Sequence, residues 1–136
     1  MSRPLLDTHV WVWWICGDER LSAREREALD NLPPSERPVL AEISLWEVAM
    51  LVERDRLQLD MDLERWLAVA SAPATVELAR VTPAVAAEVA RLPERFHRDP
   101  ADRLIVAVAR VWKLHVLTRD RKITSARLVS IWRTSG

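Results

Sequence analysis

Several residue types are scarce in this chain of 136 residues, and some of these scarcities exclude a class of protein. The sequence has two glycines, one phenylalanine, no tyrosine and a single cysteine, Cys16. One cysteine cannot form an internal disulfide, so we expect a reducing compartment, the cytoplasm. The formal net charge is zero, which argues against a broad basic surface that grips nucleic acid non-specifically. No apolar run reaches the roughly 18 residues of a membrane span, and no membrane partner is expected.

The overall composition indicates a folded protein. Hydrophobic residues make up 49 % of the chain and charged residues 29 %, a balance typical of globular rather than disordered proteins. A chain of 136 residues is long enough to bury its own hydrophobic core. We therefore expect a single domain that spans residues 1–136.

Short apolar segments alternate with helical patterns along the chain. Strand patterns occupy residues 4–7, 39–41, 75–78, 115–118 and 128–132. Helical patterns occupy residues 8–15, 22–31, 44–54, 62–71, 83–91 and 101–112. Strands that alternate with helices predict a parallel sheet with right-handed crossovers. The expected fold is therefore α/β, in three layers (α/β/α), with a parallel sheet of four to five strands.

Four acidic residues lie where such a fold places its chemistry. Asp7 and Asp120 each follow an apolar run that predicts a buried strand. Glu47 and Asp102 each lie in the first turn of an expected helix. Ligands of parallel sheets bind beyond the carboxyl ends of the strands, so these four side chains are expected to meet in one pocket. Carboxylates gathered in this way repel each other unless a cation lies among them, and Mg²⁺ or Mn²⁺ fits oxygen ligands best.

Each acidic residue also has a purely structural interpretation. Glu47 could complete a capping box with the serine three residues before it, and Asp102 could favour the positive end of a helix dipole. Asp120 could cap a turn, and Asp99, which precedes a proline, is expected to cap the following helix. Asp7 is the hardest to explain in this way, because a carboxylate at the end of an apolar strand is a poor structural choice.

Four sequence blocks that contain these residues resemble, in order and spacing, the motifs of PIN-domain ribonucleases. The blocks are residues 5–10, 43–48, 97–105 and 117–120. The likeness extends to the VapC-type endoribonucleases, which are the toxins of bacterial toxin–antitoxin pairs. It covers nearly the whole chain, and the third block is quite specific.

The resemblance implies an endoribonuclease that hydrolyses RNA phosphodiester bonds with Mg²⁺ or Mn²⁺ as its cofactor. Asp7, Glu47 and Asp102 match the core acidic trio of the family. Asp120 matches a fourth acidic position whose role varies more between members. We expect all four residues to be catalytic, with Asp7 and Asp102 holding the principal metal ion.

Three further residues are expected to support the site. Thr8 directly follows Asp7, Thr118 matches a small hydroxyl residue of the family pattern, and Asp99 is a nearby acid with an expected capping role. The family resemblance also implies partners: an RNA substrate, a cognate antitoxin protein and a second copy of the chain in a homodimer.

Basic residues lie next to the acidic positions and could contact RNA phosphates. They are Arg103, Arg119 and Arg121, with Lys122 following. Local charge compensation and ordinary surface exposure are the alternative explanations for each of them.

Seven tryptophans are the other unusual feature. Trp11 and Trp14 lie three residues apart in the first expected helix and are predicted to line an exposed groove that receives a partner's helix. Stacking on RNA bases is the alternative for this pair. Trp46, Trp66 and Trp112 are expected to fill the core.

Three other functions stay open from sequence. A receiver-type phosphoacceptor also has an acidic pocket on a doubly wound sheet, but it needs a lysine where this chain has Arg119 and Asp120. A binding module could keep the fold without catalysis, and a DNase could share it. Separate RNA and DNA substrates, each supplied with Mn²⁺, distinguish these functions.

Overall fold

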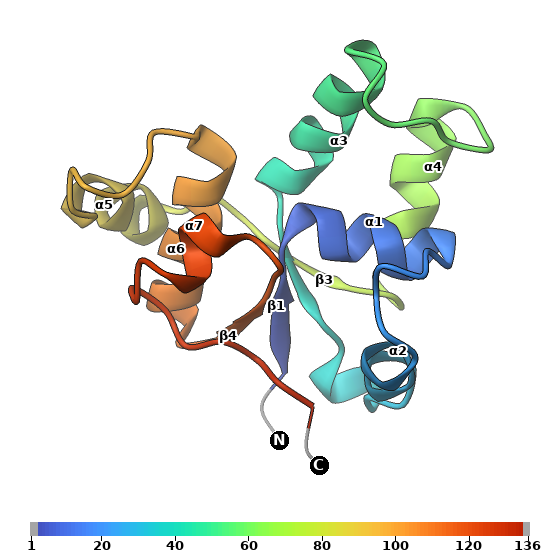
Figure 1. Ribbon diagram of the computed structural model, residues 1–136, viewed down its shortest axis with the longest axis horizontal. Coiled ribbons are helices and arrows are strands. Elements are labelled where there is room, and N and C mark those ends of the chain that lie inside the picture. The colour runs from blue at the N-terminus through green and yellow to red at the C-terminus, as the bar shows by residue number, and fades with distance from the viewer. Residues whose placement is uncertain (1–2, 135–136) are drawn as a thin grey trace.

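The computed structural model describes residues 3–134 and contains one parallel sheet. Its strands are β1 (Pro4–Leu6), β2 (Val39–Ala41), β3 (Glu77–Ala79) and β4 (His115–Leu117). They lie in the order β3-β2-β1-β4, and every pairing between neighbours is parallel. β1 and β4 therefore end side by side at the carboxyl edge of the sheet (Figure 1).

Helices connect the strands and cover both faces of the sheet (Figure 1). Leu6 packs with the first helix and with Trp66 on one face, whereas Leu5 packs with Ile105 on the other. Successive strand side chains point to opposite faces, so each strand contributes to both layers. The predicted three-layer α/β/α fold is confirmed. The helices are α1 (Thr8–Cys16), α2 (Ala23–Asp30), α3 (Ile43–Glu53), α4 (Leu63–Ala70), α5 (Pro83–Arg91), α6 (Pro100–Trp112) and α7 (Arg121–Thr124), with a short 3₁₀ helix η1 (Pro34–Glu36).

Most helix boundaries follow from local signals. Gly17 ends α1 in the left-handed conformation (φ 70°), which costs glycine little because it lacks a Cβ atom. Thr82 and Asp99 cap α5 and α6 through their side chains, and a proline follows each of them. Within residues 3–134, no helix combines the length and the apolar character that crossing a membrane requires.

The predicted strand at residues 128–132 is wrong. Within the described residues, this segment meets β4 only through a parallel bridge between Ile131 and Val116. The Val116 N–H donates to the Ser130 carbonyl at 2.9 Å, and the Trp132 N–H donates to the Val116 carbonyl at 2.8 Å. Helix α7 was not predicted, and β3 begins two residues later than the pattern indicated.

The tryptophans are distributed differently from the prediction. Trp11 is fully buried: its indole N–H donates to the Ala70 carbonyl at 2.9 Å, and its ring meets the Trp66 ring edge-on at 5.0 Å. The prediction that Trp11 lines an exposed groove is therefore wrong. Trp46, expected in the core, is 47 % exposed on α3, while Trp66 is buried as predicted and Trp112 is half-buried.

Candidate active site

Asp7 and Thr118 lie together at the carboxyl edge of the sheet. Asp7 directly follows β1 and Thr118 directly follows β4, and these strands pair with Leu6 opposite Leu117. The Asp7 N–H donates to the Leu117 carbonyl at 3.0 Å. Both side chains are buried. Their nearness is a direct consequence of the parallel register.

The Thr118 hydroxyl connects two acidic residues. It donates to Asp7 Oδ2 at 2.6 Å and accepts from the backbone N–H of Asp120 at 2.9 Å. The other oxygen of Asp7, Oδ1, accepts from the Thr8 N–H at 2.7 Å and so caps α1. Asp7 is thereby held in one orientation, and Asp120 is held beside it.

Asp102 enters the same region from the first turn of α6. Asp99 caps this helix, with its Oδ1 accepting from the Asp102 N–H at 3.0 Å, as the aspartate–proline pair predicted. The Asp102 side chain is buried, although carboxylates are rarely buried without a partner. Helix capping thus accounts for Asp99 but leaves the burial of Asp102 to be explained.

Glu47 lies in the second turn of α3 rather than in the expected first turn, and this helix has no side-chain cap, so the alternative interpretation of Glu47 as part of a capping box does not hold. Glu42 is the residue before this helix, and the Ser44 hydroxyl shares a 2.7 Å hydrogen bond with the Thr8 hydroxyl. Glu47 is half-buried, and within the described part of the chain its Oε1 has no hydrogen-bond partner. A buried carboxylate oxygen without a partner is costly unless a ligand meets it.

The acidic residues raise each other's pKa. Burial, followed by the negative charges of Asp7, Asp99, Asp120 and Glu47, raises the pKa of Asp102 to about 8. Burial also raises the pKa of Asp7, against the opposing effect of the Thr118 hydrogen bond. The pKa of Glu47 is raised by burial, with a contribution from the charge of Asp7. The four predicted carboxylates therefore act on one another as one cluster.

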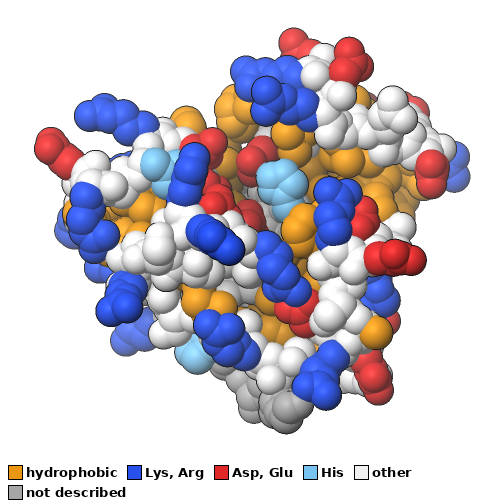
Figure 2. Space-filling model, viewed as in Figure 1, with side chains coloured by type: hydrophobic (Ala, Val, Ile, Leu, Met, Phe, Trp, Pro, Cys, Tyr) orange, Lys and Arg blue, Asp and Glu red, His pale blue; other side chains and the backbone are white. Residues whose placement is uncertain are grey.

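This cluster fits a divalent cation. Figure 2 shows acidic side chains gathered in a central hollow, with histidine beside them and lysine and arginine around the rim. The donors are hard carboxylate oxygens, one of which is buried and unpaired. A bound cation would lower the raised pKa values by stabilising the ionised carboxylates.

His97 is a site residue that the sequence interpretation missed. The structure places the ligand atoms of His97, Asp102 and Asp120 within 4.8 Å of one another. His97 Nε2 lies 2.9 Å from Asp102 Oδ2. The available signal was its position five residues before Asp102 in the third motif block.

Comparison with known proteins decides the family. Residues 5–128 match the family model described as the PIN domain. The chain belongs to the PIN-domain family. It is 36 % identical to Ribonuclease VapC22 of Mycobacterium tuberculosis over 135 residues, which cover 97 % of this chain and all of that protein.

Three solved structures share the fold of this PIN domain. The structure described as DNA-bound VapBC from Salmonella typhimurium gives a TM-score of 0.69 at 23 % identity and covers 97 % of this chain and 98 % of that one. A toxin-antitoxin complex from Klebsiella pneumoniae gives 0.63 at 19 % identity, with 93 % and 94 % covered. FitAcB from Neisseria gonorrhoeae gives 0.62 at 24 % identity, with 96 % of each chain covered.

Two of the predicted RNA-contacting arginines of the PIN domain point elsewhere. Arg103 donates to the carbonyls of Phe96 and His97 at 3.0 and 3.3 Å, so it holds the loop before α6. Arg119 donates to the Glu25 carboxylate on α2. These interactions favour local compensation over RNA contact for both residues. Arg121 and Lys122 are exposed at the start of α7, and their contact with RNA stays a prediction.

The second half of the predicted tryptophan pair is also engaged within the PIN domain. Trp14 is half-buried and donates its indole N–H to Asp30 Oδ1 at 2.8 Å. Trp11 and Trp14 therefore form no groove on the described surface, because the Trp11 ring is in the core and the Trp14 ring is hydrogen-bonded to a residue of α2.

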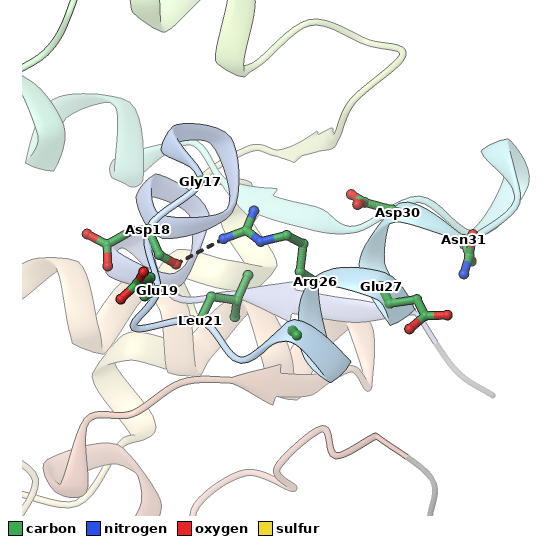
Figure 3. A pocket seen from close by; sticks show the side chains of 9 residues that line it. Gly17, Asp18, Glu19, Leu21, Arg26, Glu27, Asp30 and Asn31 are labelled. Atoms are coloured by element: carbon green, nitrogen blue, oxygen red, sulfur yellow. Dashed lines mark hydrogen bonds between the residues drawn. The ribbon is translucent and has the colours of Figure 1, made fainter.

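A separate open pocket of about 640 Å³ lies between the end of α1 and α2 (Figure 3). Arg26 points into it and donates to the carbonyls of Trp13, Trp14 and Asp18. A guanidinium at these carbonyls satisfies the last turn of α1, where backbone acceptors lack helical partners. The pocket is therefore formed around a structural cap and is distinct from the acidic cluster.

Replacing Thr118 with valine should weaken the binding of Mn²⁺ by about tenfold, since residues that orient metal ligands typically contribute that much. Valine keeps the volume but removes the donor to Asp7 Oδ2 and the acceptor for the Asp120 N–H. Calorimetric titration measures the affinity. Thr118→Ser is the matched control because it retains the hydroxyl, and equal affinities in both variants would show that the hydroxyl does not position Asp7.

Proposed function

We propose that this PIN domain is a Mg²⁺- or Mn²⁺-dependent endoribonuclease that acts as the toxin of a toxin–antitoxin pair in the cytoplasm. The observation that carries the proposal is the buried acidic cluster, in which Asp7 and Asp102 have raised pKa values and Glu47 has an unpaired oxygen. The near full-length similarity to a protein named as a ribonuclease supports the substrate class.

In the proposed mechanism, the chain's own residues hold and orient the reactants. Asp7 and Asp102 bind the metal ion, while Glu47 and Asp120 complete the set of carboxylates and orient the attacking water. When bound, the divalent cation lowers the pKa of that water and offsets negative charge on the scissile phosphate. Thr118 fixes Asp7 relative to Asp120, so the ligands need little rearrangement before the reaction.

The proposed protein partner is a cognate antitoxin. The solved structures that share this fold include one described as a toxin-antitoxin complex and one described as DNA-bound VapBC, and the first of these supports such a partner. A basic side chain of the antitoxin that reaches the acidic cluster would offset its charge, as a cation does. We also propose that the chain forms a homodimer.

Incubation of the purified protein with labelled RNA and with DNA of the same sequence tests the proposal. RNA should be cleaved with Mg²⁺ or Mn²⁺, cleavage should stop when EDTA removes the ion, and restored Mn²⁺ should revive it. Cleavage of DNA at an equal rate would indicate a DNase. No cleavage of any RNA across a broad pool, despite measured Mn²⁺ binding, would instead support a non-catalytic binding module.

A further inference from the structure

His97 is placed next to the acidic cluster by contacts of its backbone and of its ring. It lies in the loop between α5 and α6, where the Arg103 guanidinium donates to its carbonyl and to that of Phe96. Its ring also meets the Phe96 ring edge-on at 4.8 Å. These contacts place the imidazole beside the cluster and limit its movement, which favours binding of a metal ion.

The environment of His97 Nε2 is unusual. The atom is buried, and among the described residues it has no hydrogen-bond partner, although Asp102 Oδ2 lies only 2.9 Å away. The contact therefore has a short distance without the geometry of a hydrogen bond. A buried polar nitrogen left in this state is costly, and a bound ligand would remove the cost.

The 2.9 Å separation matches that of two ligand atoms on one cation. Adjacent ligands of an octahedral ion with bonds of about 2.1 Å lie about 3.0 Å apart. The Asp120 carboxylate oxygen belongs to the same group of atoms within 4.8 Å. One nitrogen and two oxygen donors thus come together from three segments of the chain: the loop before α6, α6 itself and the turn after β4.

We propose that His97 is a nitrogen ligand of the divalent cation, together with Asp102 and Asp120. This inference rests on the proposed function only in that it requires a divalent ion in the cluster. Imidazole binds transition-metal ions in preference to Mg²⁺, which retains oxygen ligands and water. His97 would therefore shift the selectivity of the site from Mg²⁺ towards Mn²⁺ and later transition-metal ions.

Pulsed electron paramagnetic resonance of the Mn²⁺-loaded protein tests the assignment without any measurement of activity. Wild-type protein with ¹⁵N in its histidines only should show coupling between Mn²⁺ and a histidine nitrogen. The coupling should vanish in His97→Ala and persist in His9→Ala, which removes an exposed imidazole from α1. Calorimetry should show Mn²⁺ binding weakened by about tenfold in His97→Ala, with Mg²⁺ binding changed by less than about threefold.

The outcomes separate the ligand assignment from the proposed function. Tight Mn²⁺ binding without histidine coupling in the wild-type protein overturns the role of His97 and leaves the carboxylate site intact. Coupling that is lost in His9→Ala but kept in His97→Ala also overturns it. Mn²⁺ binding that is undetectable, or unchanged in Asp102→Asn, removes the metal site itself and the proposed function with it. His97→Asn is a second variant in case His97→Ala folds poorly: the coupling should be lost in it as well, and coupling that persists in a folded His97→Asn protein would overturn the assignment.

Discussion

Replacing Asp7 with asparagine is expected to slow RNA cleavage by about a thousandfold or more, a loss typical of removing one preorganised charge-stabilising group from an active site. The amide is neutral and can offer a cation one weak oxygen instead of a carboxylate. The fold should survive, because asparagine is a good helix cap and its carbonyl can still accept from the Thr8 N–H. In the wild-type protein the Thr118 hydroxyl donates to Asp7 Oδ2. In the variant, the asparagine amide N–H can donate to that hydroxyl instead.

Initial rates on a fluorogenic RNA measure this effect, and thermal melting checks the fold. Asp62→Asn is the matched control, because Asp62 is an exposed cap of α4 whose side chain accepts from the Arg65 N–H at 2.9 Å. It makes the same chemical change at a helix start away from the cluster, so its activity should stay near that of the wild type. Undiminished cleavage by Asp7→Asn would remove Asp7 from the mechanism.

Without divalent cations, the protein should become less stable as the pH rises from about 4 to about 8. Burial and the neighbouring carboxylates raise the pKa of Asp102 to about 8 in the folded chain. In the unfolded chain an aspartate has a pKa of about 3.9, so within this window the folded state binds more protons than the unfolded state. Rising pH then favours unfolding. This loss of stability is complete once the pH exceeds the pKa of Asp102 in the folded chain.

The free energy of unfolding is expected to fall by about 2–4 kcal/mol across this window. This is less than the pKa shift of Asp102 alone would give at about 1.4 kcal/mol per pKa unit, because the acidic residues interact and titrate together. Burial raises the pKa of Asp7 as well, which acts in the same direction. The lowered pKa of Asp18, about 2 beside Arg20, changes stability only at more acidic pH.

Urea denaturation in EDTA at several pH values measures how the free energy of unfolding changes with pH. Mn²⁺ should restore stability at the alkaline end, because a ligand that binds only the folded state stabilises it. Asp102→Asn should flatten the slope, while Asp62→Asn should retain it. Stability that is constant or rises across this window would mean that the acidic residues are not mutually repulsive.

The helices and strands were largely predictable because their signals are local. The aspartate–proline pair at the start of α6 and the glycine at the end of α1 mark boundaries that the structure reproduces to within a residue. The prediction for α3 was wrong at its start because the Ser44 hydroxyl is used by Thr8, 36 residues away, rather than by the helix. The pattern at 128–132 resembles a strand, but only Ile131 pairs.

Helices that are apolar on nearly every side gave the least reliable predictions of burial. In α1 and α3 the hydrophobic periodicity does not indicate which side faces the sheet, since polar residues do not mark an outer face. Trp11 consequently proved to be buried and Trp46 exposed, the opposite of both predictions.

The order of residues along the chain was sufficient to place carboxylates after two strands and near the starts of two helices, because strand and helix signals are local and parallel strands share an edge. Tertiary structure alone decided which neighbours these carboxylates have. In the folded chain Thr118 donates a hydrogen bond to Asp7, 111 positions away in sequence. Arg119 pairs with a glutamate of α2, and His97 lies against Asp102. Such pairs depend on loop paths and on packing between distant segments, and no local pattern encodes them.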